Sequence, residues 1–163
     1  MKIKLARIDD RLIHGQVTTV WAKEANAERI IIPSDDVASD EIRKTLVKQA
    51  APPGIKVNVV TTDKAIKVYH NPKYENDTVF YLFTKPQEVV DLVKGGVPIK
   101  SINIGGMQFK EGRTQLTKAV SVSKEDIEAF KELIGLGVTL DCRVVVTDSS
   151  KDFEALLKEV KIQ

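Results

Sequence analysis

The sequence contains little of what a disulfide framework or a metal centre requires. Cys142 is the only cysteine among 163 residues, so an internal disulfide is excluded. His14 and His70 are the only histidines, and with one cysteine they cannot assemble a common Cys/His zinc cluster. We therefore expect neither a metal nor another cofactor, and the cysteine usage fits a reducing cytoplasm.

Long apolar runs and an excess of one charge are also missing. No apolar stretch approaches the roughly 20 residues of a membrane span, and the beginning of the chain, MKIKLARID, lacks the apolar region of a signal peptide. The 25 basic and 23 acidic residues leave a net charge of +2, which gives no argument for nucleic-acid binding. We expect a cytoplasmic protein that reaches a membrane only through a partner.

The composition that remains is that of an ordinary globular protein. Hydrophobic residues make up 42% and charged residues 29% of the chain, which excludes disorder and fibrous architectures. The length suits one domain, and no repeat, low-complexity segment or linker divides it. We predict a single domain over residues 1–163.

Strand patterns and helix patterns alternate along the whole chain. The expected strands cover residues 2–8, 29–33, 56–61, 78–83, 101–104, 118–122 and 138–146. The expected helices cover residues 15–26, 40–51, 63–70, 86–95, 124–135 and 152–161. Such alternation predicts a doubly wound α/β fold, with a mainly parallel sheet and helices on both faces.

Several of the predicted helices have recognisable starts or apolar faces. Ser39 and Thr62 are suitable N-caps for the helices that follow them, and Ser123 is expected to form a capping box. In the first helix, Val20 and Trp21 are expected to face the core.

The densest group of chemically active residues is the segment RIDDRLIHGQVTTVW at 7–21, between the first strand and the first helix. Open α/β folds bind ligands at this kind of boundary. Our hypothesis is that His14 carries a phosphoryl group. Either Arg7 or Arg11 is suited to bind the phosphoryl oxygens with two nitrogens of its guanidinium group. Gly15 allows close approach, and the amides at the helix start add positive potential.

The two aspartates of this segment are an objection to the hypothesis, because a carboxylate facing the phosphoryl group would repel it. We therefore expect Asp9 and Asp10 to orient an arginine or the far imidazole nitrogen, or to cap backbone amides. The nucleophile is a neutral imidazole, which needs no strong base. From the residues alone, His14 equally fits an ordinary loop histidine among surface ion pairs.

Polar and small residues follow two other predicted strands. Asp35 either supports Arg7 or Arg11 from a neighbouring strand end, or belongs to a turn and helix start. Gly105 and Gly106 either support the site by bringing backbone close to it, or form a tight turn. We favour the supporting role for the two glycines.

Three apolar residues stand in otherwise polar loops. Ile13, Met107 and Phe109 are candidates for a patch that docks a partner, although Met107 and Phe109 also fit beneath their own loop. The second histidine, His70, precedes Asn-Pro at a helix end, and we interpret it as structural.

The segment DDRLIHGQV, continuing to Trp21, resembles the active-site segment of IIB components in the mannose family of bacterial phosphotransferase systems. The resemblance continues through four further segments in the same order: SDD at 34–36, RKTL at 43–46, VPIKSINIGGMQF at 97–109 and SVSKED at 121–126. Together these segments are specific, whereas a short histidine motif alone would be weak evidence.

The resemblance implies a role for this chain in sugar uptake. In that family, the residue at the position of His14 takes a phosphoryl group on Nδ1 from a phosphohistidine of the IIA component and passes it to a sugar entering through the membrane components IIC and IID. The Arg11 position stabilises the phosphoryl group. The resemblance also implies association with the inner face of the membrane through IIC and IID. It leaves open the sugar, which is mannose, fructose, sorbose or an amino sugar, and the oligomeric state.

Two alternatives come from other functional classes. A nucleotide- or phosphate-ligand-binding sensory module is compatible with the fold, but the chain has neither the G-x-G-x-x-G nor the Walker A pattern. A phosphohistidine mutase or phosphatase usually needs an acid or a second histidine facing the first, and His70 is the only other histidine.

Overall fold

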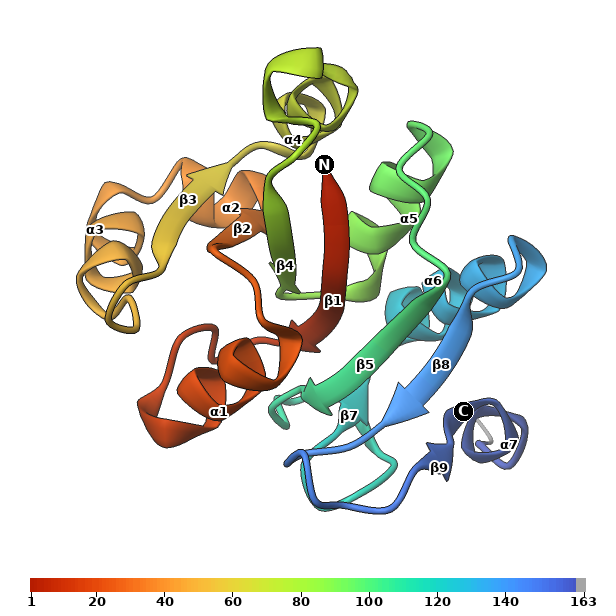
Figure 1. Cartoon of the computed structure of the whole chain (residues 1–163). Helices are drawn as coiled ribbons and strands as arrows, with labels where there is room; N and C mark the ends of the chain where they lie inside the picture. The colour runs from red at the N-terminus through yellow and green to blue at the C-terminus, as the bar shows by residue number, and fades with distance from the viewer. Residues whose placement is uncertain (161–163) are drawn as a thin grey trace.

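The computed structural model describes residues 1–160, and their largest element is a seven-stranded sheet (Figure 1). Along the sheet the strands are β3 (Lys56–Val60), β2 (Arg29–Pro33), β4 (Thr78–Phe83), β1 (Lys2–Asp9), β5 (Ser101–Gly106), β8 (Thr139–Cys142) and β9 (Lys151–Asp152). The first six of these are parallel, and β9 pairs with β8 in the antiparallel direction. A separate antiparallel pair consists of β6 (Thr114–Gln115) and β7 (Ser121–Val122).

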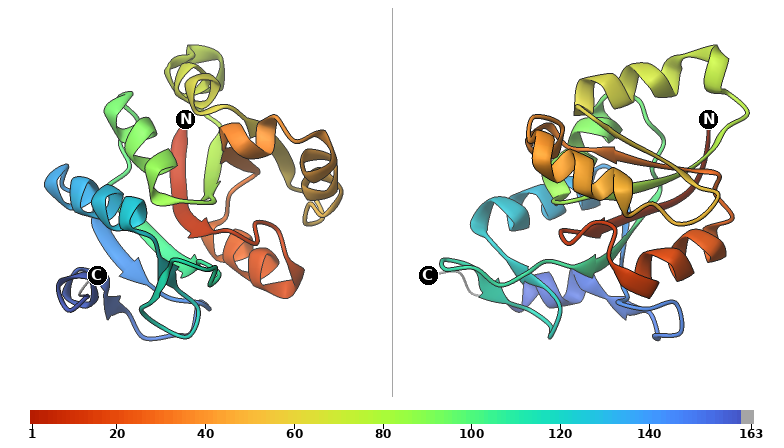
Figure 2. Two further views of the ribbon diagram at one scale, coloured as in Figure 1. Left: turned by 180° about the vertical axis from the view of Figure 1, so that it is seen from behind. Right: turned by 90° about the vertical axis from the view of Figure 1, so that its left-hand side faces the viewer.

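Helices cover both faces of the sheet, as the doubly wound prediction requires (Figure 2). One face packs against α1 (Gly15–Ala25), the short α2 (Asp35–Ala38) and α3 (Glu41–Gln49). The other packs against α4 (Thr62–His70), α5 (Pro86–Lys94), α6 (Lys124–Gly135) and α7 (Phe153–Lys158). A 3-10 turn, η1 (Pro72–Tyr74), follows α4. Among residues 1–160, no helix combines the length and apolarity that crossing a membrane requires.

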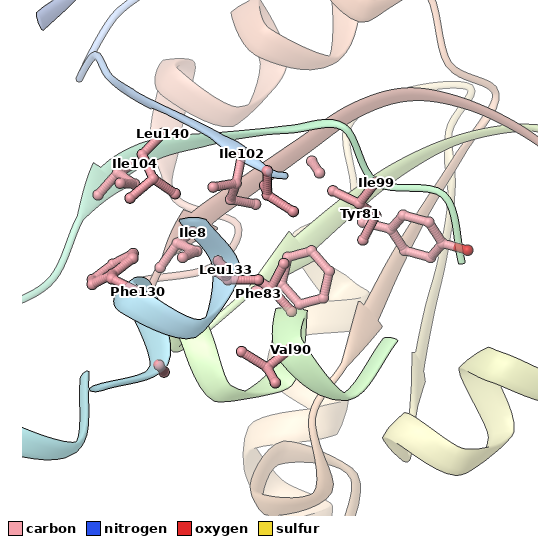
Figure 3. Close-up of a cluster of buried hydrophobic side chains, with 14 of the residues drawn as sticks. Ile8, Tyr81, Phe83, Val90, Ile99, Ile102, Ile104, Phe130, Leu133 and Leu140 are labelled. Carbon is pink, nitrogen blue, oxygen red and sulfur yellow. The ribbon is translucent and has the colours of Figure 1, made fainter. Parts of the chain in front are cut away.

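The core has two layers because neighbouring side chains of a strand point to opposite faces. In β4, Tyr81 and Phe83 belong to the cluster under α5 and α6, whereas Phe80 and Leu82 belong to the cluster under α1 and α3. Figure 3 shows the larger cluster, in which Phe130 and other helix residues meet the strand side chains. From Val79 to Phe83 the strand is therefore buried at every position, as the run VFYLF predicts.

The order of the strands creates a topological switch point between β1 and β5. These strands are neighbours, but the chain leaves β1 through α1 toward β2 and leaves β5 through α6 toward β8, on the opposite side (Figure 1). Ligands of open α/β sheets bind at such a reversal, outside the carboxyl ends of the strands. The register places Asp9 opposite Gly106 at this point.

The structure confirms the alternation of elements and corrects some of their limits. The expected strand at 118–122 is reduced to the two residues of β7, and that at 138–146 ends at Cys142. The short helix α2 was not expected. The closing helix, expected over 152–161, is α7, and residue 161 lies outside the described residues.

The helix starts also differ in detail from the expectations. Asp40 and Thr61 accept the capping hydrogen bonds that were assigned to Ser39 and Thr62. The capping box at Ser123 is confirmed. In α1, Val20 is 47% exposed, so its expected place in the core is wrong, while Trp21 is buried.

Candidate active site

A tight loop after β1 places His14 at the start of α1. Leu12 has a φ of +60°, a strained backbone conformation for a side chain other than glycine, and its burial against the core offsets the cost. His14 is the N-cap of α1, and its N–H donates to Thr18 Oγ1 at 3.1 Å. Thr18 Oγ1 in turn donates to the carbonyl of Leu12 at 3.2 Å. The Thr18 hydroxyl thus links the N–H of His14 to the carbonyl of Leu12 and fixes the backbone of the loop.

The Asp9 carboxylate is the centre of the site and is 1% exposed. Arg11 donates to it through Nε at 3.0 Å and through Nη2 at 3.1 Å, and Arg7 Nη2 donates at 3.3 Å. His14 Nε2 lies 3.1 Å from Asp9 Oδ2. An ionised carboxylate only accepts hydrogen bonds, so Nε2 carries the imidazole proton. Nδ1 of the neutral ring therefore keeps its lone pair.

The surrounding donors keep Asp9 ionised. Burial alone would raise the pKa of this carboxyl group. Hydrogen bonds from Arg11 and His14, together with the charges of Arg11 and Arg7, outweigh burial and hold the pKa of Asp9 below its ordinary value. A buried, ionised carboxylate therefore faces the imidazole at neutral pH.

Arg7 is a buried structural residue, with 2% of its surface exposed. Its Nη1 donates to the side-chain oxygen of Asn103 and, at 2.9 Å, to the carbonyl of Arg143. Its Nη2 donates to Asp9 and, at 2.9 Å, to the carbonyl of Val144. Burial lowers the pKa of Arg7 despite the neighbouring carboxylate. With these donors occupied, Arg7 is not available to a phosphoryl group, whereas Arg11 is 37% exposed.

Trp21 completes the surroundings of Arg7. The guanidinium carbon lies 4.7 Å from the centre of the indole ring, a favourable cation–π distance. Trp21 Nε1 donates to the carbonyl of Val144 at 3.1 Å. Two buried side chains therefore hold the segment that follows β8 against the site.

The two glycines that end β5 are required by close packing rather than by a turn. A Cβ on Gly105 would lie 2.0 Å from Cζ of Arg7. A Cβ on Gly106 would lie 3.0 Å from an oxygen of Asp9 and from Nη2 of Arg11. Neither glycine has a positive φ. Their part in the site is to let the ionic cluster lie directly on the strand.

Asp10 points away from the histidine and joins two loops. Its Oδ2 accepts the N–H of Gln108 at 2.8 Å, so it caps a backbone amide, one of the roles expected for it. Its backbone carbonyl accepts Nη2 of Arg43 at 3.1 Å. Burial raises the pKa of the Asp10 carboxyl group.

Asp35 does not support the site. Its side chain is exposed, accepts the N–H of Thr62 at 2.9 Å and so fixes the start of α4. It contacts neither Arg7 nor Arg11, because it belongs to the helix start that follows β2. The interpretation as a site-supporting residue is wrong, and that as a helix-start residue is correct.

The three candidates for partner docking have different surroundings. Phe109 is 62% exposed and Ile13 is half-buried. Met107 is 1% exposed and belongs to the core, so it offers no surface to a partner and lies beneath its loop instead. The second histidine, His70, donates from Nε2 to the carbonyl of Gly95 at 2.8 Å and contacts none of the site residues.

Sequence reasoning missed the partners of Arg7. Asn103 is 4% exposed, and its only local signal is an amide within the apolar run SINI. The carbonyls of Arg143 and Val144 carry no sequence signal. Among residues 1–160, no three or more histidine, cysteine, aspartate or glutamate side chains gather as metal ligands would.

Comparison with known proteins shows the family of this chain. The family model described as "PTS system sorbose subfamily IIB component" matches residues 3–163. The chain belongs to this family. The expected kinship with mannose-family IIB components is thereby confirmed. The chain is a phosphoryl-relay component of a sugar phosphotransferase system, and its enzyme class is phosphotransferase.

Individual relatives agree with the assignment. The sorbose-specific EIIB component of Lacticaseibacillus casei is 67% identical over 160 residues, which are 98% of this chain and 98% of that protein. The mannose-specific EIIAB component of Escherichia coli K12 is 54% identical over 98% of this chain and 50% of that protein. A crystal structure is known for the IIBSor domain of the sorbose permease from Klebsiella pneumoniae, whose sequence is 60% identical to this chain. The two structures agree with a TM-score of 0.96, and the match covers 100% of each chain.

Proposed function

We propose that His14 is the phosphoryl carrier of this IIB component and that the phosphoryl group is attached to Nδ1. The observation that supports this most directly is the 3.1 Å contact between Asp9 Oδ2 and His14 Nε2. It assigns the proton to Nε2 and leaves the lone pair on Nδ1. His14 is 25% exposed, which is compatible with reaching a partner.

In the first transfer, the Nδ1 lone pair of His14 forms the new N–P bond. The N–P bond of the donor phosphohistidine breaks at the same time, and its electron pair stays on the donor imidazole. Because Nε2 keeps its proton, the ring of His14 becomes positively charged as the bond forms. The buried Asp9 carboxylate stabilises this charge. In the second transfer, the oxygen of a sugar hydroxyl forms the new O–P bond and the hydroxyl proton passes to solvent. The N–P bond of His14 breaks, and its electron pair returns to Nδ1, which leaves the imidazole neutral.

Arg11 is the arginine that we assign to the phosphoryl oxygens. Its Nε and Nη2 hold Asp9, whereas its Nη1 makes no hydrogen bond to any of the described residues. Phosphoryl transfer depends mainly on position and charge stabilisation, which a partly exposed guanidinium supplies. The space beside Gly15, at the start of α1, is open, since a Cβ on this residue would meet nothing within 4 Å.

The wider role follows from family membership. We infer that a IIA component is the donor, and that the membrane components IIC and IID present the sugar at the cytoplasmic face of the membrane. The sorbose-specific relatives support sorbose as the sugar. The match over residues 3–163 supports one IIB domain over the chain.

A phosphorylation assay tests the proposal. The chain is incubated with phosphoenolpyruvate, the general phosphotransferase proteins and a IIA partner. We expect an acid-labile, base-stable phosphoprotein whose phosphorus NMR signal identifies the Nδ1 isomer. His14→Ala is expected to abolish labelling, and His70→Ala, the matched variant of the other histidine, to retain it. Unchanged labelling of His14→Ala would exclude His14 as the acceptor.

A further inference from the structure

A polar depression of about 430 Å³ lies beside the site. It shares no lining residue with the cluster of Arg7, Asp9, Arg11 and His14. It forms where the ends of β1, β4 and β5 meet the helices after β2. We call it the polar basin, and its charged residues are Asp10, Asp36, Arg43, Lys85, Lys110 and Arg113. The phosphoryl relay uses none of these side chains.

Positive charge predominates in the polar basin, with four cations and two carboxylates. Asp36 is neutralised by Lys85, whose Nζ lies 3.0 Å from it. Arg113 pairs with Asp10 at 4.0 Å, whereas Arg43 and Lys110 form no ion pair among the described residues. Two of the four cations therefore lack a carboxylate partner, and the basin keeps an excess of positive charge.

The two arginines are held in place by backbone carbonyls. Arg43 donates from Nη2 to the backbone carbonyl of Asp10 at 3.1 Å. Arg113 donates from Nη1 to the backbone carbonyl of Gln108 at 3.0 Å. A carbonyl fixes a guanidinium but carries no net charge, so Arg43 keeps its full charge for an anion, while Arg113 shares its charge with Asp10 at the longer distance of 4.0 Å. Two guanidinium groups and a lysine around one depression match the oxygens of a phosphate group.

We propose that the polar basin binds the phosphate group of a small phosphorylated molecule. The lining also includes Gln108, whose side-chain amide suits the hydroxyls of a sugar, and Thr84, whose hydroxyl donates to Glu88 and can only accept from a ligand. Asp10 opposes an anion here, because only its Oδ2 is bound, by the N–H of Gln108, whereas its Oδ1 is buried without a hydrogen-bond partner. The four cations of the basin outnumber its two carboxylates. The ligand class is a phosphate monoester or inorganic phosphate.

Amide NMR titration of the full chain tests this site. The probes are inorganic phosphate, a hexose 1-phosphate and the unphosphorylated hexose. We expect saturable shifts at the amides of Thr84, Gln108 and Arg113 with the two phosphates and none with the free sugar. Arg43→Gln and Lys110→Gln should each weaken binding roughly tenfold, the loss of about one charge-assisted hydrogen bond. Lys48→Gln removes an exposed charge of α3 outside the basin and should have no effect.

The outcomes separate the ligand and the site. If the hexose 1-phosphate binds more tightly than inorganic phosphate, the ligand is a sugar phosphate. If the two bind equally, the basin recognises the phosphate group alone. Both results support the polar basin as a binding site. Shifts confined to His14 and its neighbours, or equal weakening by Lys48→Gln, would overturn it. Absence of saturation up to high phosphate concentration would do the same, and would argue that the cations serve a protein partner. Binding is measured without phosphoryl transfer, so failure here leaves the proposed relay unaffected.

Discussion

At the scale of single residues, the contact of Asp9 with His14 Nε2 determines which imidazole nitrogen keeps its lone pair. Asp9→Asn replaces one acceptor oxygen by an N–H donor that faces other donors. We expect phosphoryl transfer from IIA to slow roughly 100-fold, about 2.7 kcal/mol of transition-state stabilisation. Rapid-quench kinetics measures the rate. The control variant Asp35→Asn changes an exposed carboxylate away from the site, and its rate of phosphoryl transfer should equal that of the wild type. A wild-type rate in Asp9→Asn would contradict the role assigned to Asp9.

The lowered pKa of Asp9 also predicts how stability depends on pH. A carboxyl group whose folded pKa is depressed contributes stability above its unfolded pKa and loses that contribution as pH falls through the folded value. The stabilising effect of ionised Asp9 should thus be complete above its ordinary value of 3.8 and disappear below it. Urea unfolding of the wild type and Asp9→Asn, from neutral pH down to below 3.8, measures the difference. A difference that grows on acidification would contradict the prediction.

Gly105 is predicted to tolerate no side chain. In Gly105→Ala the new Cβ would occupy the position of the Arg7 guanidinium, which must leave its buried partners. We expect a loss of about 2–4 kcal/mol in the free energy of unfolding, measured by urea denaturation. Gly135→Ala is the matched control, since a Cβ at this position in α6 meets nothing within 4 Å and the φ is not positive. Equal stability of the two variants would refute the packing argument.

At the scale of elements, the segment after β8 depends on side chains of β1 and α1. Trp21→Phe keeps an apolar ring but removes the hydrogen bond to Val144. We expect a loss of about 1 kcal/mol and faster hydrogen exchange at the amides of residues 144–148. Ser123→Ala removes the cap of α6 at a comparable cost of about 1 kcal/mol and should not accelerate exchange in that segment. Equal acceleration in both variants would indicate general destabilisation instead.

The sequence predicts elements well where a local pattern decides them. The apolar run of β4 and the capping box at Ser123 are such cases, since both signals lie within a few residues. The early end of β8 is different. Arg7 binds carbonyls 136 and 137 residues away, and no local pattern encodes such a contact. Asp9 ends β1 and Asp10 begins the loop that follows, and only the folded chain shows which of them faces the histidine.

At the scale of the whole molecule, the site depends on the strand order. Because β1 lies between β4 and β5, the histidine loop stands over the reversal point of the sheet, and the two glycines of β5 lie beneath the ionic cluster. Family membership could be inferred from the order of several motifs. The division of labour between Arg7 and Arg11 could not, because it depends on burial.

The bonds from Arg7 to the carbonyls of Arg143 and Val144 have a consequence for biosynthesis. The two carbonyls that Arg7 binds lie 136 and 137 residues after it, so they are synthesised long after the histidine loop. A nascent chain that ends at Cys142 would hold a buried guanidinium without two of its acceptors. The geometry of the candidate site can therefore be completed only after translation has passed Val144.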